Sequence, residues 1–526
     1  MEKFLPVSVN DFGKMIRDNF LYVDKTRYIY EMVHIPQALY FLSRPRRFGK
    51  TLLVSTLRAL FEGKKELFKG LWIDRTDWQW KKHPVVLIDF SGITSDTSTG
   101  LKRGILRKLN TLAHKNDIEI EGELLPESFK ELIVGLHEKY RENVVVLVDE
   151  YDRPLISHLG KGEEALRIAT ENRTILKNFF GTLKDADVSA ALRFVLLTGI
   201  SKFPKVSIFS DLNNLKDLSM NSFFAPLLGY TQQELESYFH NRIEKLGEKL
   251  DKSYKETVEI LEERYNGYRF SNFDVTVYNP YSILNALTDL ELGNYWFETA
   301  TPSFLVNLIK EKQYPIPELE KLELSTMSFS VYDIDYLELE SLLFQTGYLT
   351  IKDVDADLYK LSYPNQEVKT SFLAYVYKQL VEISRTSIKE QYTRLHQYLR
   401  KENIETFMET VNSILSSIPY QHISNQDEHY YHTVFYLMLS ASGVDVQTEV
   451  LTSVGRIDME VYFEDKIYII ELKCNQESEE AIKQIKSNKY YEKHLSANKK
   501  ILLMGINFSS VERRISDWKL EEMESI

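Results

Sequence analysis

A run of aliphatic residues that ends in carboxylates is the feature that most constrains the fold of this chain. Residues 144–148 are Val-Val-Val-Leu-Val, and they lead directly into Asp149 and Glu150. A strand that is aliphatic on both faces is typical of a parallel sheet with helices on both sides. We therefore expect the two carboxylates to lie at the carboxyl edge of such a sheet.

A second strand pattern, over residues 39–44, leads into Pro-Arg-Arg-Phe-Gly49-Lys50-Thr51 and then into a helical pattern over 52–61. This order of strand, loop and helix is typical of a phosphate loop. In such a loop Gly49 lets the backbone approach the phosphates, Lys50 contacts the β- and γ-phosphates, and the Thr51 hydroxyl reaches Mg²⁺. A lone Gly-Lys-Thr can also be a helix N-terminus that binds no ligand.

The loop departs from the usual pattern at its first position, where Arg44 replaces a glycine. With Arg46 and Arg47 it forms a basic cluster that would add positive potential beside bound phosphates. The alternative for this cluster is an ordinary solvated loop.

The strand ends predict the remaining parts of a nucleotide site. Asp149 would hold Mg²⁺ directly or through water, and Glu150 would orient or deprotonate the attacking water. Thr198, near the end of a strand pattern over 193–199, would sense the γ-phosphate. Paired carboxylates after a strand can instead be a helix N-cap and first-turn charge.

The C-terminal segment has a different pattern of elements. A helix is expected from Glu428, strands over 446–450, 456–463 and 466–473, a helix over 478–494 and a strand over 500–505. This α-β-β-β-α-β order is that of the core of restriction-endonuclease-like folds.

Three residues of this segment carry candidate chemistry. Asp458 lies near the start of one predicted strand, and Glu471 and Lys473 lie near the end of the next. The period of a strand places Glu471 and Lys473 on one face, where two carboxylates and a lysine suit Mg²⁺-dependent phosphodiester cleavage. The alternative is a half-buried strand pair with surface charges.

A basic stripe is predicted on the helix that follows. Lysines at 483, 486, 489 and 493 repeat at steps of three and four residues, and would follow a phosphate backbone or simply form a solvated face.

Composition excludes several classes of protein. A net charge of −12 argues against a strongly basic nucleic-acid-coating protein, and the single Cys474 excludes an internal disulfide framework or thiolate metal cluster. The absence of a long apolar run or a signal-peptide core predicts a cytoplasmic protein without a membrane span.

Five motifs of the N-terminal half together resemble the AAA-ATPase-like domain of many bacterial proteins that end in a PD-(D/E)XK nuclease domain. They are Tyr22-Val-Asp-Lys-Thr, Ser43-Arg-Pro-Arg-Arg-Phe-Gly-Lys-Thr-Leu, Val148-Asp-Glu-Tyr-Asp-Arg-Pro-Leu, Leu197-Thr-Gly-Ile-Ser-Lys-Phe and Ile208-Phe-Ser-Asp-Leu-Asn-Asn-Leu. By itself the first of these suggests an ordinary surface turn.

The resemblance implies an α/β chain of three parts. Residues 1–229 would form the P-loop domain, 230–424 a mainly helical lid and linker, and 425–526 the restriction-endonuclease-like α/β domain. It carries Asp458, Glu471 and Lys473 over as the nuclease residues, Glu428 as a further metal ligand, and Gln484 with Tyr490 as a helix feature. Together with Lys486, the last two are candidate nucleic-acid contacts.

The resulting hypothesis is a protein that binds ATP, and is expected to hydrolyse it, fused to a Mg²⁺-dependent nuclease. DNA is favoured over RNA as the substrate of this nuclease. The resemblance suggests a role in defence or mobile-element biology, and homo-oligomerisation is left open. One alternative is a nucleotide-regulated binding or signalling protein with an inactive nuclease domain. Another is an ATPase remodeller with a structural tail.

Overall fold

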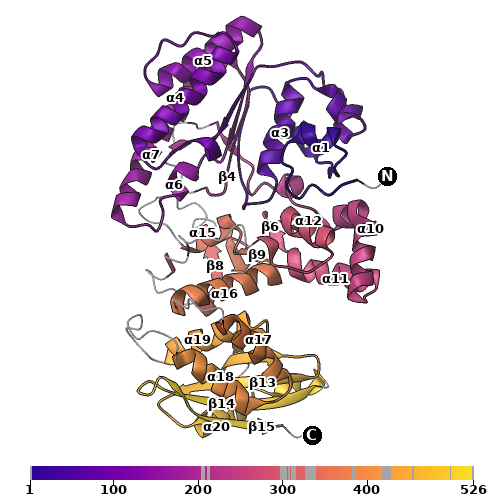
Figure 1. The fold of residues 1–526 in the computed structure, drawn as a ribbon, viewed down its shortest axis with the longest axis vertical. Coiled ribbons are helices and arrows are strands. Elements are labelled where there is room, and N and C mark those ends of the chain that lie inside the picture. The colour runs from indigo at the N-terminus through magenta and orange to yellow at the C-terminus, as the bar shows by residue number, and fades with distance from the viewer. Residues whose placement is uncertain are drawn as a thin grey trace. The chain divides into compact units, whose positions relative to one another are not determined.

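The computed structural model describes residues 3–202, 208–209, 212, 214–296, 305, 308–309, 316–320, 322–325, 339–381, 387–416, 428–452, 455–497 and 499–523. It divides into two compact units (Figure 1). The first comprises Met1–Ile309 and Glu320–Val368, and the second comprises Lys310–Leu319 and Lys369–Ile526. The boundaries predicted at residues 229 and 424 stay predictions.

The first unit is built on a five-stranded sheet of order β2-β3-β4-β1-β5, in which every pair is parallel. The strands are β1 (Ala38–Ser43), β2 (Val85–Asp89), β3 (Val144–Asp149), β4 (Leu192–Gly199) and β5 (Lys216–Asp217). All six residues of β3 are buried, as expected for an aliphatic strand covered on both faces. The predicted strands and the α/β class are confirmed.

Helices cover both faces of this sheet (Figure 1). One layer contains α4 (Ser98–Lys115), α5 (Leu125–Tyr140) and α7 (Glu163–Gly181), and the other contains α1 (Phe12–Arg17) and α3 (Lys50–Phe61). Shorter helices are α2 (Thr26–Val33), α6 (Arg153–Ile156) and α8 (Ala186–Ala191). Because β4 lies between β1 and β3, Thr198 is placed between the loop after β1 and the carboxylates after β3.

The segment from Tyr22 to Thr26 is not the surface turn that it suggests by itself. Lys25 is 8% exposed and donates to both carboxylate oxygens of Glu234, at 2.7 and 2.6 Å. Asp24 accepts hydrogen bonds from the Thr26 hydroxyl and from the backbone of Trp72. These contacts fix the start of α2 against α10 (Gln232–Leu250).

The rest of the first unit combines helices with small antiparallel sheets. Besides α10, the helices are α11 (Tyr254–Tyr265), α12 (Pro280–Asp289) and α15 (Leu339–Thr346). A capping box of Thr231 and Glu234 begins α10. A hairpin is formed by β9 (Thr350–Asp355) and β10 (Leu358–Ser362), and β10 also pairs with β8 (Leu322–Ser325). In a separate sheet, β6 (Tyr268–Arg269) pairs with β7 (Thr276–Val277).

The second unit contains a five-stranded sheet of order β11-β12-β13-β14-β15. The strands are β11 (Asp445–Leu451), β12 (Arg456–Tyr462), β13 (Lys466–Cys474), β14 (Lys500–Ser509) and β15 (Arg514–Glu522), and only β13 and β14 pair in parallel among these described strands. The predicted order of elements is confirmed, and β15 extends the sheet.

The helices of this unit are α17 (Ser387–Arg400), α18 (Ile404–Ser416), α19 (Glu428–Ala441) and α20 (Ser478–Ser487), while α16 (Gln366–Val381) includes residues of both units. The predicted helix over 478–494 is wrong at its C-terminus. Asn488 caps α20, and Lys489 has a positive φ of 49°, a left-handed conformation that ends a helix. A 3₁₀ helix, Glu492–Ala497, follows.

No helix in the described part of the chain is both long and apolar enough to cross a membrane. Phe203, Ser210, Asp211 and Asn213 of the motifs, and Ser453 and Val454 before β12, lie outside the described residues.

Candidate functional sites

The loop after β1 has the geometry that its glycine requires. Gly49 is the N-cap of α3 and has a φ of +93°, a region that residues with a Cβ rarely adopt. No atom lies within 4 Å of the position that a Cβ of Gly49 would take. The backbone is therefore open toward the adjacent cavity at the start of α3.

Lys50 is buried beneath this loop. Its Nζ donates to the carbonyl oxygens of Arg44 and Pro45, each at 2.8 Å. Burial lowers the pKa of Lys50 to about 8, and the nearby carboxylates of Asp149, Asp152 and Glu150 oppose that shift. The loop carbonyls thus hold the Lys50 ammonium group close to the carboxylates that follow β3.

Asp149 connects three segments that sequence analysis had predicted separately. Its Oδ2 accepts from the Thr51 hydroxyl at 2.7 Å, and its Oδ1 accepts from the Thr198 hydroxyl at 2.6 Å. Burial raises the pKa of Asp149, whereas these two hydrogen bonds and the charge of Lys50 favour the ionised form. The structure therefore brings Lys50, Thr51, Asp149 and Thr198 together.

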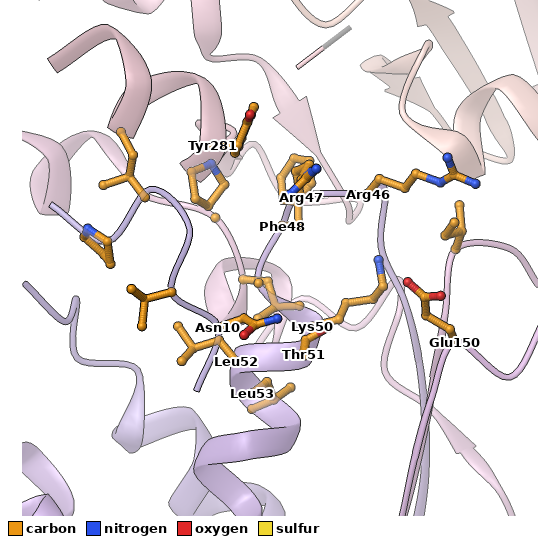
Figure 2. Close-up of a pocket in the computed structure, with 18 of the residues that line it drawn as sticks. Asn10, Arg46, Arg47, Phe48, Lys50, Thr51, Leu52, Leu53, Glu150 and Tyr281 are labelled. Carbon is orange, nitrogen blue, oxygen red and sulfur yellow. The ribbon is translucent and has the colours of Figure 1, made fainter. Parts of the chain in front are cut away.

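Glu150 lies beside this cluster. It has a positive φ of 55° and forms an ion pair with Arg153 at 2.9 Å. Figure 2 shows the Lys50 and Glu150 side chains pointing toward each other, and both line the same cavity.

The cavity has a volume of about 920 Å³. It is lined by residues 46–53 of the loop and α3, by Glu150 and Asp152, and on other sides by Asn10 and Tyr281 (Figure 2). A space of this size, beside a helix N-terminus and a lysine, suits a phosphorylated ligand the size of a nucleotide.

Arg44 does not line this cavity, unlike the other two arginines of the predicted basic cluster. It is 1% exposed, lies 4.2 Å from the centre of the Phe270 ring, and donates to the carbonyl oxygen of Ser219 at 2.6 Å. The residue that replaces the usual glycine therefore supports the loop from the protein interior. Arg46 and Arg47 line the cavity.

Aromatic residues far along the chain also support the loop. Phe48 packs edge-on against Tyr268 and Phe270, with ring centroids 4.8 and 5.4 Å apart. The indole Nε1 of Trp296 donates to the carbonyl oxygen of Arg46 at 3.0 Å, and the backbone of Trp296 donates to Glu367 at 2.8 Å.

Asp152 was missed by sequence analysis as a functional residue. It is 1% exposed, and its Oδ2 accepts from the backbones of Ile200 and Ser201 and from the Ser201 hydroxyl. It thereby fixes the segment that directly follows Thr198. The second aspartate in Asp-Glu-Tyr-Asp was the available signal.

In the second unit, Asp458 and Glu471 lie across adjacent antiparallel strands, one position beyond the Met459–Ile470 pair. The Asp458 Oδ2 accepts from the backbone of Leu472 at 2.8 Å. The Glu471 Oε1 accepts from Lys473 at 3.4 Å and from the amide of Gln484. Asp458, Glu471, Lys473 and Gln484 are therefore brought together at one place.

One oxygen of this cluster has no partner. The Glu471 Oε2 is buried and accepts no hydrogen bond from any described residue. Burial, followed by the nearby Asp458 carboxylate, raises the pKa of Glu471 above its usual range, while Lys473 opposes the shift. The side chains of the site therefore do not fully stabilise the ionised form of Glu471.

Close packing places α20 over these strands. Gly505 pairs with Glu471, and a Cβ on Gly505 would lie 2.4 Å from the carbonyl oxygen of Ser478, the first residue of α20. Only a residue without a side chain fits there, so α20 approaches closely enough for Gln484 to reach Glu471.

Glu428 and Tyr490, which were also predicted as site residues, do not join the cluster around Glu471. Glu428 is exposed at the start of α19. Within the described ranges, no three His, Cys, Asp or Glu side chains lie close enough together to hold a metal ion, so Glu428 is not brought to the Asp458–Glu471 pair. Tyr490 is 2% exposed and packs in the core beside α20, so its ring is not available here to stack on a base.

The predicted lysine stripe is not a free basic surface. Each of its four lysines forms an ion pair with a carboxylate: Lys483 with Glu480, Lys486 with Glu521, Lys489 with Glu492 and Lys493 with Glu460. Because α20 ends at Ser487, the last two do not lie on that helix.

Comparison with known proteins connects both sites to described families. Residues 6–209 match the family described as predicted AAA-ATPase, and residues 426–518 match the PD-(D/E)XK nuclease superfamily. The "Uncharacterized protein in vnfD 5'region" of Azotobacter chroococcum mcd 1 is 36% identical to this chain, covering 99% of each. The chain belongs to the family of proteins that join an AAA-ATPase-like domain to a C-terminal PD-(D/E)XK nuclease domain.

Among solved structures, the Walker-type ATPase PABY2304 of Pyrococcus abyssi is similar over 70% of this chain and 98% of its own, with 13% identity and a TM-score of 0.33. For this AAA-ATPase-like and PD-(D/E)XK family the expected ligands are a nucleotide, a divalent metal and a nucleic-acid substrate.

The contact between Trp296 and the loop predicts a measurable effect on nucleotide binding. Trp296→Phe keeps an aromatic ring but removes the donor to the Arg46 carbonyl, which should weaken affinity by about 1 kcal/mol, roughly five-fold. Calorimetric titration with ATP measures it, and Trp72→Phe, at a tryptophan that is 41% exposed, is the control. Equal affinity in parent and Trp296→Phe would show that the loop does not depend on this contact.

Proposed function

We propose that this chain binds ATP with Mg²⁺ at the loop of residues 44–51 and hydrolyses phosphodiester bonds of nucleic acid, DNA in preference to RNA, at Asp458, Glu471 and Lys473. In this proposal residues 1–229 are the ATPase-like domain, 230–424 the lid and linker, and 425–526 the nuclease domain. The observation that carries the nuclease part is the buried, unpartnered Oε2 of Glu471 beside the Asp458 carboxylate.

The residues of this cluster fit a divalent cation. The Asp458 carboxylate raises the pKa of the buried Glu471 carboxyl, and a divalent cation held by these two residues would offset their repulsion. Mg²⁺ commonly uses one or two carboxylates and completes its coordination with water and substrate phosphate, so the pair is sufficient without a third acidic residue. A role for Glu428 as a further ligand stays a proposal from the family resemblance, because this structure does not bring Glu428 to the pair. When bound, the metal would polarise the scissile phosphate and lower the pKa of the attacking water.

The neighbouring side chains have roles that follow from their contacts. Lys473, on the same strand face as Glu471, would hold a phosphate oxygen or stabilise the attacking hydroxide. Gln484 donates to Oε1 of Glu471, and this contact orients the carboxylate with Oε2 unpartnered. Asp458, Glu471 and Lys473 are all present and close together. This supports a domain that cleaves nucleic acid over the alternative of an inactive domain that only binds it.

The nucleotide part of the proposal is supported by the hydrogen bonds that Thr51 and Thr198 both donate to Asp149. The two oxygens assigned to Mg²⁺, Thr51 Oγ1 and Asp149 Oδ2, lie 2.7 Å apart in this structure. Lys50 would contact the β- and γ-phosphates, Glu150 would orient the attacking water, and Thr198 would respond to the γ-phosphate through Asp149. ATP binding would switch or load the nuclease.

Substitution of the nuclease residues tests the cleavage activity. Asp458→Ala and Lys473→Ala should each lower Mg²⁺-dependent cleavage by about 10²–10⁴-fold, because each removes a group placed at the reacting phosphate. The substrates are linear, circular and single-stranded DNA and RNA, with and without ATP, and with Mg²⁺ or Mn²⁺.

Lys489→Ala is the matched control for Lys473→Ala, because Lys489 is an exposed lysine of the same unit that pairs with Glu492. Circular dichroism verifies that each variant is folded. Cleavage at the parent rate by both Asp458→Ala and Lys473→Ala would remove the assignment of this site.

Two substitutions separate nucleotide binding from hydrolysis. Lys50→Ala should weaken ATP affinity at least ~10-fold, because a buried cation beside the phosphates is lost. Glu150→Gln should retain affinity while phosphate release stops. Calorimetry and a phosphate-release assay distinguish these results, and unchanged affinity in the first or parent turnover in the second refutes the corresponding role.

A further inference from the structure

Helix α4 (Ser98–Lys115) has a charge pattern that the proposed sites do not use. Its 18 residues include five lysines and arginines and no aspartate or glutamate, in a chain of net charge −12. The basic residues are Lys102, Arg103, Arg107, Lys108 and Lys115, with His114 beside the last.

The positive charges of α4 do not stabilise the fold through ion pairs. None of its five lysines and arginines forms an ion pair with another residue of the described parts of the chain. Basic residues on the adjacent helices do form such pairs: Lys130 of α5 with Asp185 and Asp187, and Arg167 of α7 with Glu164 and Glu171. In the nuclease unit, the predicted lysine stripe is likewise neutralised.

The helix separates its apolar and basic residues. Leu101, Ile105, Leu109 and Ala113 are buried at four-residue steps. Arg103, Arg107 and Lys115 are exposed on the opposite side of the helix, whereas Lys102, which is also exposed, lies on the side of the buried residues at the start of the helix. Figure 1 shows α4 in the helical layer on the opposite side of the sheet from α3.

The dimensions of this basic face match a phosphate backbone. At a rise of about 1.5 Å per residue, Arg103 and Lys115 are separated by about 18 Å along the helix axis, or roughly five base-pair steps. The exposed residues of α4 include no Phe, Tyr or Trp on which an unpaired base would stack. Single-strand binders combine basic grooves with such aromatic platforms, so this face fits a duplex better.

We propose that the exposed face of α4 binds the phosphate backbone of double-stranded DNA, so that the ATPase-like unit itself holds the substrate of the nuclease. This inference rests on the proposed function for the identity of the nucleic acid. It assigns substrate binding to α4, which contains none of the proposed nucleotide or nuclease residues. Phosphate contacts of this kind give affinity without sequence preference.

The test compares two triple variants of the 526-residue chain on a 20-base-pair duplex, in EDTA so that binding is measured without cleavage. Arg103→Ala/Arg107→Ala/Lys115→Ala removes three unpaired charges. Lys249→Ala/Lys252→Ala/Lys255→Ala removes three charges that are paired with Glu291, Glu256 and Glu259. The two variants have the same net charge, and alanine favours the helical conformation at five of these positions, whereas Lys252 lies in the turn between α10 and α11.

The α4 variant should bind the duplex at least ~10-fold more weakly than the parent at about 0.1 M salt. In a plot of log affinity against log salt concentration, the slope of the α4 variant should be smaller in magnitude than the slope of the parent by about 2 to 3. Each lost phosphate contact removes about 0.9 from the slope, and three contacts are lost. The control variant should keep the parent slope.

Equal slopes in the α4 variant and the parent would overturn the inference while leaving the cleavage assay, and with it the proposed function, untouched. A parent that does not bind the duplex would overturn it as well. A loss confined to single-stranded DNA, or a change in oligomeric state at unchanged duplex affinity, would also overturn it, because the face would then serve another partner.

Discussion

Buried carboxylates at strand ends are the constraint on which both sites depend. Moving an isolated carboxylate out of water costs several kcal/mol, so each one must be matched by donors or cations. Asp149 is matched by two hydroxyls and the charge of Lys50, and Asp152 by the backbone of the segment after β4. Glu471 is matched on one oxygen only. The carboxylates at the end of β3 therefore already have their partners within the protein, whereas the Glu471 site still requires a cation.

The phosphate loop shows how a departure from a common pattern is compensated. A glycine at the first position would leave the loop to be shaped by its own backbone, whereas Arg44 extends into the interior and packs on Phe270. Phe48 and the carbonyl of Arg46 are then contacted by Tyr268 and Trp296, more than 200 residues further along the chain. The conformation of the loop thus depends on residues that would otherwise be assigned to a scaffold. These contacts join the loop directly to residues 268–296 of the first unit.

Much of the fold followed from the sequence because the parallel strands are continuously aliphatic and the turns between elements are well marked. The meeting of Thr51, Asp149 and Thr198 followed from the rule that parallel strands end at one edge. Two kinds of feature did not follow. The role of Arg44 depends on a ring at residue 270, and no local pattern connects the two. The lysine stripe was predicted on a single helix because helical spacing does not show that α20 ends at Ser487. It also does not show the carboxylates of other elements that pair with Lys486 and Lys493.

Calorimetric titration of Mn²⁺ into the nucleotide-free chain measures whether Asp458 and Glu471 together hold a divalent cation. The parent should bind Mn²⁺ at a site that is lost in Glu471→Gln and in Asp458→Asn, two substitutions that keep side-chain shape and remove one negative charge. Parent-like Mn²⁺ affinity in both variants would show that these carboxylates do not hold the metal.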